Sequence, residues 1–436
     1  MRSNATVSTT FAATHATHRV ELLVTLAGET PVNRKPVNVA LVLDRSGSMQ
    51  GMPLEAAREA ALLFTSFLNA EDRLTVVTFD EDAYLVFGPG AGNDPAAQDA
   101  IRRIACGGST NLSAGWLEAH RALARSLVPW INRVVLLTDG QANRGIVDHT
   151  MLGSLVGGAT SERVTTSCIG FGPHFDENLL RLLSDKGDGH FWYVEGLDQM
   201  AGSFEGEIEG LVTLAAQNAT VTIQLSHPGV AGATIVPSVP FERTGSGGWK
   251  VRLGDLYASA PRSLGVVFHV ENAESLGSVE IGSVTVEADL VREDGVEHIT
   301  ALVPVMATLD GQDRVEPTVE RAFLKFAAAD AREAAVRHAD AGQYPAAAQV
   351  LRDTAFRFPE QTSEQELREI RNDLLAEAAR LDREIYGTSD RKYNLARSEM
   401  AKDGRGAREQ KLSRRRPPAP LPPQAPPSPP LPSSNA

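Results

Sequence analysis

Between residues 37 and 212, short apolar runs alternate with segments in which apolar residues recur at helical spacing. The run 37–43 is almost entirely apolar, which is typical of a strand buried on both faces of a sheet. Pro53 then opens a helix over 53–67, since a proline in the first turn loses no intrahelical hydrogen bond. This alternation predicts a doubly wound α/β domain with a mostly parallel sheet over residues 36–213.

The rest of this segment follows the same alternation of strand and helix patterns. Further strands are expected at 73–79, 84–87, 133–138, 164–169 and 191–194, and further helices at 95–104 and 113–127. The strand 84–87 is short and should lie at an edge of the sheet. In folds of this kind ligands bind beyond the carboxyl ends of the strands, so the polar residues there are the first candidates for function.

The pattern changes near residue 217, where apolar and polar residues begin to alternate with a period of two. Clusters of glycine and serine, such as 245–248, separate the alternating runs. An antiparallel β-sandwich is therefore expected over 214–312. Residues 17–35 alternate in the same way, so we expect them to supply a strand to this sandwich, with the α/β domain inserted into it.

The two ends of the chain have other patterns. Residues 313–400 are rich in alanine and predict a helical region, with helices over 319–339 and 346–356. This helical pair resembles one tetratricopeptide unit, but one copy cannot bury a continuous core, so a bundle is favoured. Residues 401–436 carry seven Lys and Arg against two acids and then become proline-rich, which predicts a disordered tail, either simply solvated or bound by a polyproline-binding partner. Residues 1–16 are expected to be a flexible N-terminus.

Composition and charge narrow the classes of partner. The formal net charge is -13, and nucleic acid binding needs a positive face, so no nucleic acid partner is expected. No stretch offers the roughly 18 apolar residues of a membrane span, so no membrane insertion is expected. The use of only two cysteines fits the reducing cytoplasm, so a cytoplasmic location is expected. Cys106 and Cys168 fall in a predicted loop and a predicted buried strand, which does not indicate a disulfide. A packing role is favoured for Cys106 over that of a reactive thiol.

Three predicted loops at the carboxyl edge of the sheet carry oxygen-bearing side chains. The residues expected to bind a metal are Asp44, Ser46, Ser48, Thr110 and Asp139. Two carboxylates and three hydroxyls form a hard oxygen set of low charge, which suits Mg²⁺ or Mn²⁺ better than Ca²⁺. Gly47 and Gly140 are expected to permit the tight turns beside these ligands.

The motif Asp44-x-Ser46-x-Ser48, the separate Thr110 and the run Thr138-Asp139-Gly140 resemble the complete metal-ion-dependent adhesion site of von Willebrand factor type A (vWA) domains. The resemblance covers roughly residues 35–212, and the layout of the chain is similar to cytosolic bacterial vWA proteins. It implies that the hydroxyls coordinate the ion and that the aspartates bind it directly or through water. It also implies that an acidic side chain of a protein partner fills the vacant position, so the chain is expected to be a metal-dependent binding module and not an enzyme.

Two other functions are compatible with the same residues. A metal-assisted hydrolase would use an ion-bound water, but the sequence shows no evident general base for it. A scaffold would act through the helical region and the Pro-rich tail. Arg45, between two expected ligands, has two interpretations: it pairs with an incoming acidic partner or it points into water.

Overall fold

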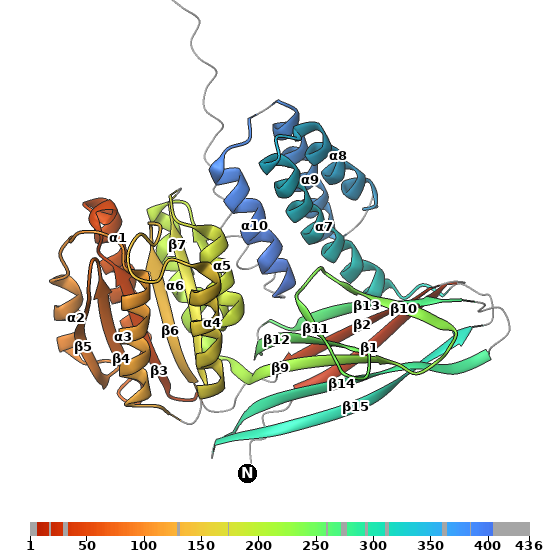
Figure 1. Ribbon diagram of the computed structural model, residues 1–436, viewed down its shortest axis with the longest axis horizontal. Helices are drawn as coiled ribbons and strands as arrows, with labels where there is room; N and C mark the ends of the chain where they lie inside the picture. The colour runs from red at the N-terminus through yellow and green to blue at the C-terminus, as the bar shows by residue number, and fades with distance from the viewer. Residues whose placement is uncertain are drawn as a thin grey trace, which may run out of the picture.

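The computed structural model describes residues 7–16, 19–28, 34–128, 131–172, 174–258, 260–271, 277–292, 295–309, 314–359, 364–383 and 385–403. The molecule has three parts that lie side by side: an α/β layer, two antiparallel sheets and a group of helices (Figure 1). The expected fold class, α/β with an accompanying β-sandwich and a C-terminal helical region, is confirmed. The proline-rich tail expected over 401–436 lies, from residue 404 onward, outside the described residues.

The sheet of the α/β layer has the strand order β5-β4-β3-β6-β7-β8. Its strands are β3 (Val37–Asp44), β4 (Arg73–Phe79), β5 (Ala83–Ala91), β6 (Ile131–Thr138), β7 (Val164–Phe171) and β8 (Asp188–Val194). Neighbouring strands are parallel except β5, which runs antiparallel to β4 at the edge. β3, β6 and β7 are buried at every position, as the mostly apolar run of β3 predicts, although β7 also buries Thr165, Thr166 and Ser167.

Helices cover both faces of this sheet (Figure 1). One face packs against α1 (Met52–Ser66), α2 (Pro95–Arg102) and α6 (Leu197–Val212), and the other against α3 (Leu112–Ala124), α4 (His149–Ala159) and α5 (Glu177–Lys186). Short 3-10 turns are η1 (Gly47–Met49) and η2 (Thr160–Glu162). Phe64 of α1 meets Phe204 of α6 edge to face at 5.8 Å, and both are fully buried. Burial of one such side chain contributes roughly 1.5–3 kcal/mol, so the helices are held chiefly by their apolar faces.

The β-sandwich consists of two antiparallel sheets around a separate apolar core. One sheet has the order β1-β2-β13-β10 and the other β11-β12-β9-β14-β15. Their strands are β1 (Val7–Ala16), β2 (Arg19–Gly28), β9 (Leu214–Leu225), β10 (Val230–Val236), β11 (Phe241–Arg243), β12 (Trp249–Tyr257), β13 (Arg262–Val270), β14 (Gly277–Arg292) and β15 (Gly295–Leu309). β2 pairs with β13, so the α/β layer is inserted in sequence between strands of the same sheet.

The N-terminal segment differs from the expectation. We expected residues 1–16 to be flexible, which is wrong for Val7–Ala16: this segment forms β1 and pairs with β2 along its whole length. The segment contains Val7, Phe11 and several threonines, residue types that favour strands. The neighbouring strand β2 supplies the hydrogen-bonding partner, which the composition of the segment alone could not reveal.

Four helices complete the described chain: α7 (Pro317–Asp340), α8 (Tyr344–Phe356), α9 (Gln365–Asp382) and α10 (Thr388–Lys402). The first three share an alanine- and leucine-rich core, and α10 lies between them and the α/β layer (Figure 1). Lys392 of α10 is buried and donates to Glu177 Oε2 at 2.8 Å, which fastens α10 to the start of α5. Within the described ranges, no helix combines the length and apolar character that crossing a membrane requires.

Candidate functional site

The candidate site lies at the carboxyl edge of the parallel sheet, where three loops meet. Asp44 is the last residue of β3, and Asp139 directly follows the last residue of β6. Thr110 precedes Asn111, which caps the start of α3 by accepting from Ala114 N. The sheet order places β3 and β6 side by side, so residues about 95 positions apart in the sequence reach the same place.

Hydrogen bonds join the side chains of the first and third loops into one cluster. Ser46 N donates to Asp44 Oδ1 at 2.8 Å, and the hydroxyl oxygens of Ser46 and Ser48 lie 3.1 Å apart. The Ser48 hydroxyl in turn donates to Asp139 Oδ1 at 2.7 Å. Four of the five residues expected to bind a metal therefore form a continuous chain of polar contacts.

Thr110 of the second loop borders the same space. A methyl group placed on Gly140 would lie 3.4 Å from Thr110 Oγ1 and 3.6 Å from Ser48 Oγ, so the two hydroxyls flank a common point. Asn143 fixes this loop, because its Oδ1 accepts from Thr110 N at 2.9 Å while its own N–H donates to Thr110 O at 3.0 Å. The structure thus brings all five expected residues together, with Asn143 as a support that the sequence analysis missed.

Burial gives the two carboxylates unusual electrostatics. Asp44 has no exposed surface, and this burial raises its pKa to about 6, against the lowering effect of hydrogen bonds from Ser46 and Thr138; the charge of Asp139 adds a smaller increase. The pKa of Asp139 is also raised by burial, although the hydrogen bond from Ser48 opposes the increase. Two neighbouring, largely buried carboxylates are electrostatically unfavourable alone, and a cation between them would offset this cost.

The donor set fits a small hard cation. All of the side-chain donors are oxygens, which suits Mg²⁺ or Mn²⁺. In the described part of the chain, no three His, Cys, Asp or Glu side chains are grouped as metal ligands, so an ion here would depend on the hydroxyls as well as on the two carboxylates. Three of the donors, Asp44, Ser46 and Thr110, are at most 4% exposed, whereas Ser48 is exposed to solvent.

The glycine that this site requires is not one of the two expected. Neither Gly47 nor Gly140 adopts a positive φ angle, so the expected need for glycine at these tight turns is wrong. Gly107 is the restrictive position, because a Cβ atom there would lie 1.9 Å from Asp80 Oδ2. Its missing side chain lets the loop before Thr110 close onto the end of β4.

Of the two interpretations of Arg45, the one in which it points into water is wrong, and pairing with an acidic partner stays a prediction. Its Nη2 lies 2.7 Å from Asp80 Oδ2, and its guanidinium carbon lies 4.5 Å from the centroid of the Tyr84 ring. It therefore pairs within its own chain and does not simply point into water. Asp80 was missed by the sequence analysis, although it directly follows β4 just as Asp44 ends β3, and that placement was the available signal.

Two further side chains adjoin the cluster. The positive field of His174 favours the charged form of Asp139 and so lowers its pKa, against the larger effect of burial. Cys106 is exposed, contrary to its expected packing role, and its thiol donates to the backbone oxygen of Ser46 at 3.2 Å. Their positions depend on loops whose conformation the sequence pattern does not specify.

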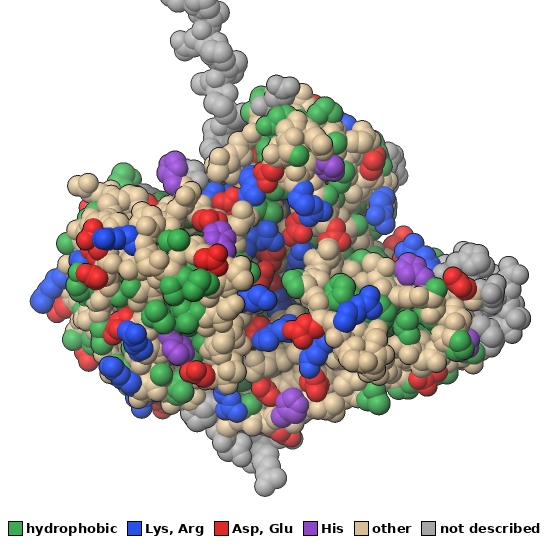
Figure 2. Space-filling model, viewed as in Figure 1, with side chains coloured by type: hydrophobic (Ala, Val, Ile, Leu, Met, Phe, Trp, Pro, Cys, Tyr) green, Lys and Arg blue, Asp and Glu red, His purple; other side chains and the backbone are tan. Residues whose placement is uncertain are grey.

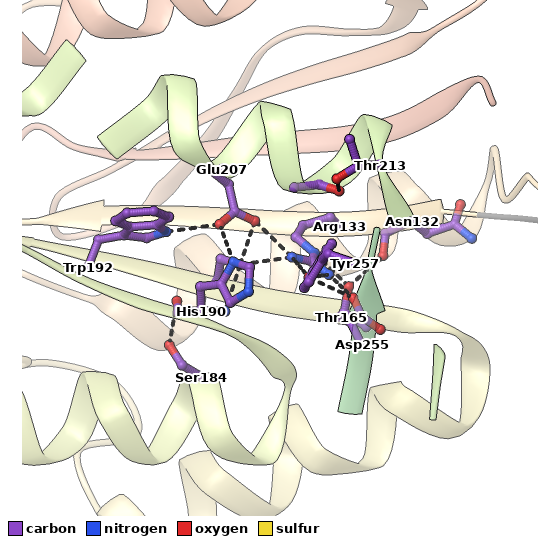
Figure 3. A network of polar contacts seen from close by, with 12 residues as sticks. Asn132, Arg133, Thr165, Ser184, His190, Trp192, Glu207, Thr213, Asp255 and Tyr257 are labelled. Carbon is purple, nitrogen blue, oxygen red and sulfur yellow. Dashed lines mark hydrogen bonds and ion pairs between the residues drawn. The ribbon is translucent and has the colours of Figure 1, made fainter. Parts of the chain in front are cut away.

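A second polar cluster is fully buried and has a different character (Figure 3). Arg133 of β6 pairs with Glu207 of α6, with Nη1 2.8 Å from Oε1, and with Asp255 of β12. Glu207 Oε2 also accepts from Trp192 Nε1 at 2.9 Å. This cluster joins the α/β layer to the sandwich. Because Arg133 and Glu207 have no exposed surface, it offers no access to a ligand.

Comparison with known families agrees with this architecture. Residues 39–141 match the sequence model of the family described as the von Willebrand factor type A domain. The doubly wound layer and the matched segment together identify a vWA domain in this part of the chain.

Several individual proteins are similar to this chain. An uncharacterised protein of Synechocystis sp. is 28% identical over 337 residues, which cover 74% of this chain and 78% of the relative. Inter-alpha-trypsin inhibitor heavy chain H1 of Homo sapiens is 27% identical over 202 residues, which are 44% of this chain but only 22% of that protein. The similarity to the Synechocystis protein thus extends over more of this chain, whereas the similarity to heavy chain H1 is confined to about a fifth of that protein.

Solved structures show that the fold extends beyond the matched segment. The von Willebrand factor type A protein from Catenulispora acidiphila superposes with a TM-score of 0.69 at 18% identity, covering 93% of this chain and 99% of that structure. The ArnB paralog VWA2 from Sulfolobus acidocaldarius superposes with a TM-score of 0.59 at 16% identity, covering 91% of this chain and 98% of that structure. At these identities the likeness establishes a shared three-part architecture and nothing further.

Proposed function

We propose that this chain binds one divalent cation, Mg²⁺ or Mn²⁺, and uses it to bind an acidic side chain of a partner protein. The ion would be held by Asp44, Ser46, Ser48, Thr110 and Asp139. A bound cation would supply a positive charge and a free coordination position for a carboxylate. The activity is binding, without a catalytic step.

The observation that supports this proposal best is the convergence of three loops on one set of oxygens. Ser48 contacts both Ser46 and Asp139, from loops that follow β3 and β6, and Thr110 flanks the same point. A purely structural role for such residues, as turn or cap formers, would satisfy each loop separately. Here the contacts run between the loops, because the Ser48 hydroxyl donates to Asp139 and the Thr138 hydroxyl donates to the buried Asp44 carboxylate.

The difference in exposure supports an open position on the ion. Asp44, Ser46 and Thr110 would approach it from the buried side, because they are at most 4% exposed. Ser48 lies at the solvent boundary. An ion held from one side in this way stays accessible to a carboxylate that arrives from solvent.

Calorimetric titration with Mn²⁺ tests the ion site. Ser48→Ala removes one of the proposed ligands, so it should weaken Mn²⁺ binding at least tenfold. Because the lost hydroxyl is exposed, the unfolding temperature should stay close to that of the parent protein. Ser66→Ala, an exposed serine at the end of α1, is the matched control and should change neither quantity. Equal Mn²⁺ affinity in the parent and Ser48→Ala proteins would contradict the assignment of this ligand.

Capture of partners from a native lysate tests the use of the ion. The proposal predicts that EDTA releases a captured protein, that Mn²⁺ restores its capture and that Ser48→Ala does not capture it. Capture that is unchanged by EDTA but lost when residues 404–436 are deleted would instead favour the scaffold function. Metal-dependent turnover of a phosphoester or peptide would favour the hydrolase.

A further inference from the structure

Asp80 connects the loops that carry the proposed ligands. It is 5% exposed and directly follows β4. Its carboxylate pairs with Arg45 of the first loop at 2.7 Å, and its backbone oxygen accepts from Asn111 N, next to Thr110, at 2.7 Å. One residue thus contacts two of the three ligand loops while contributing no ligand itself.

The neighbouring backbone is arranged around this contact. Gly107 has no side chain that would displace the Asp80 carboxylate, and Gly107 N donates to Arg45 O at 2.6 Å. Gly47 N donates to Gly108 O at 2.7 Å. The first and second loops are therefore joined on both sides of the Arg45–Asp80 ion pair.

The position of the Arg45 guanidinium depends on few contacts. Its Nη2 pairs with Asp80, and its Nη1 reaches Ala105 O only at 3.5 Å. Its Nε is buried without a hydrogen-bond partner in the described part of the chain. The Tyr84 ring supports the guanidinium from one face at 4.5 Å. Asp80 is therefore the group that compensates the charge of Arg45 and fixes its direction.

We infer that Asp80 is a positioning residue that keeps the Arg45 charge from competing with the metal ion. Arg45 immediately follows the ligand Asp44, and a guanidinium carries a permanent positive charge. Without Asp80 this charge would be uncompensated beside two carboxylates, where it would repel a cation or pair with those carboxylates in its place. This inference rests on the proposed function, because it concerns the occupancy of the same ion site.

The test is a set of Mn²⁺ titrations on the full chain. Asp80→Asn should weaken Mn²⁺ binding about tenfold, because a positive charge near the site is no longer neutralised, and the loss should shrink at high ionic strength. Adding Arg45→Gln to Asp80→Asn should restore the affinity to within about threefold of the parent, because the competing charge is gone. Asp80→Glu keeps the negative charge, so its Mn²⁺ affinity should also stay within about threefold of the parent's.

The rescue separates this role from a purely structural one. If Asp80 only held the loops together, removing Arg45 as well would not restore the affinity, so a double variant as weak as Asp80→Asn overturns the inference. Should Asp80→Asn not fold, Arg45→Gln alone still decides: undiminished Mn²⁺ affinity supports the inference, and a loss overturns it. Failure of the proposed function is distinguishable, because then the parent protein itself would bind no Mn²⁺ and both statements would fall.

Discussion

Arg133 shows how a buried charge is compensated at the level of single residues. Its guanidinium has no exposed surface and contacts the carboxylates of Glu207 and Asp255 from two other elements. Arg133→Met would leave both carboxylates buried without this guanidinium, so we expect a loss of about 3–5 kcal/mol in the free energy of unfolding. Chemical denaturation followed by circular dichroism measures this loss.

The matched control is an ion pair at the surface. Lys250 and Glu287 lie 2.8 Å apart with side chains 37% and 32% exposed, so Lys250→Met should cost less than about 1 kcal/mol. Equal losses for Arg133→Met and Lys250→Met would show that the buried cluster does not stabilise the fold in the way described.

Asn143 allows a prediction about the support of the ion site. Its side-chain Oδ1 accepts from Thr110 N at 2.9 Å, and only this bond is lost in Asn143→Ala, because the bond to Thr110 O comes from the Asn143 backbone N–H. Asn143→Ala should weaken Mn²⁺ binding by roughly 10- to 100-fold, as the loss of residues that orient metal ligands commonly does. Isothermal calorimetry measures the change, with Gln98→Ala, a partly exposed residue of α2, as the control. An affinity equal to the parent's would mean that Thr110 does not need this support or is not a ligand.

The residues of the candidate site were predictable to different degrees. Asp44 and Asp139 end or follow strands whose apolar runs are plain in the sequence, so their meeting at one edge followed from the fold class. Arg45, Asp80 and Asn143 depend on side-chain contacts between loops, for which the sequence offers no periodic pattern. The metal-binding role itself stays a prediction.

At the level of elements, β1 is the clearest addition to what the sequence indicated. β2 is hydrogen-bonded on one side to β1 and on the other to β13. Deleting residues 1–16 would expose the edge of β2, so we expect a lower unfolding temperature and a tendency to aggregate. Differential scanning calorimetry and light scattering measure the two effects.

A shorter deletion is the control for this prediction. Removing residues 1–6 leaves Val7–Ala16 whole and should have little effect on either quantity. If the longer deletion were equally harmless, β1 would contribute nothing to the stability of the sandwich.

Helix α10 gives a second prediction at this level. Lys392 is 1% exposed, donates to the Phe175 carbonyl and to Glu177, and lies 3.5 Å from the centroid of the Phe175 ring. Lys392→Met should loosen α10 from α5, so hydrogen exchange in α10 should accelerate while the amides of β3 stay protected. Lys325→Met, whose ion pair with Glu366 is about one-third exposed, is the control. Unchanged exchange in α10 would contradict the importance of this contact.

The whole molecule is a set of three interlocked parts. β8 is the last strand of the α/β sheet and packs against α10 and against β12 of the sandwich, while the Arg133 cluster joins β6 to β12 (Figure 3). Charged side chains gather in the hollow between the three parts (Figure 2). Arg181 of α5 pairs with Glu333 of α7 at 3.0 Å and with Glu399 of α10. The parts are thus held together by charge as well as by apolar packing.

The three kinds of layer could be predicted because each has its own hydrophobic period. The contacts between the layers could not, since a pair such as Arg133 and Asp255 joins residues 122 positions apart, and neither position alone indicates its partner. Tertiary pairing of this kind is decided by the packed structure and leaves no local signal.

The central claim is that side chains from three loops of the vWA domain bind one divalent cation. Crystals grown with Mn²⁺ and measured for anomalous scattering test this most directly. The account predicts a single strong peak bounded by Asp44, Ser46, Ser48, Thr110 and Asp139, with a coordination position left open toward solvent. Absence of a peak there at saturating Mn²⁺, or a peak bound by other residues, would contradict it.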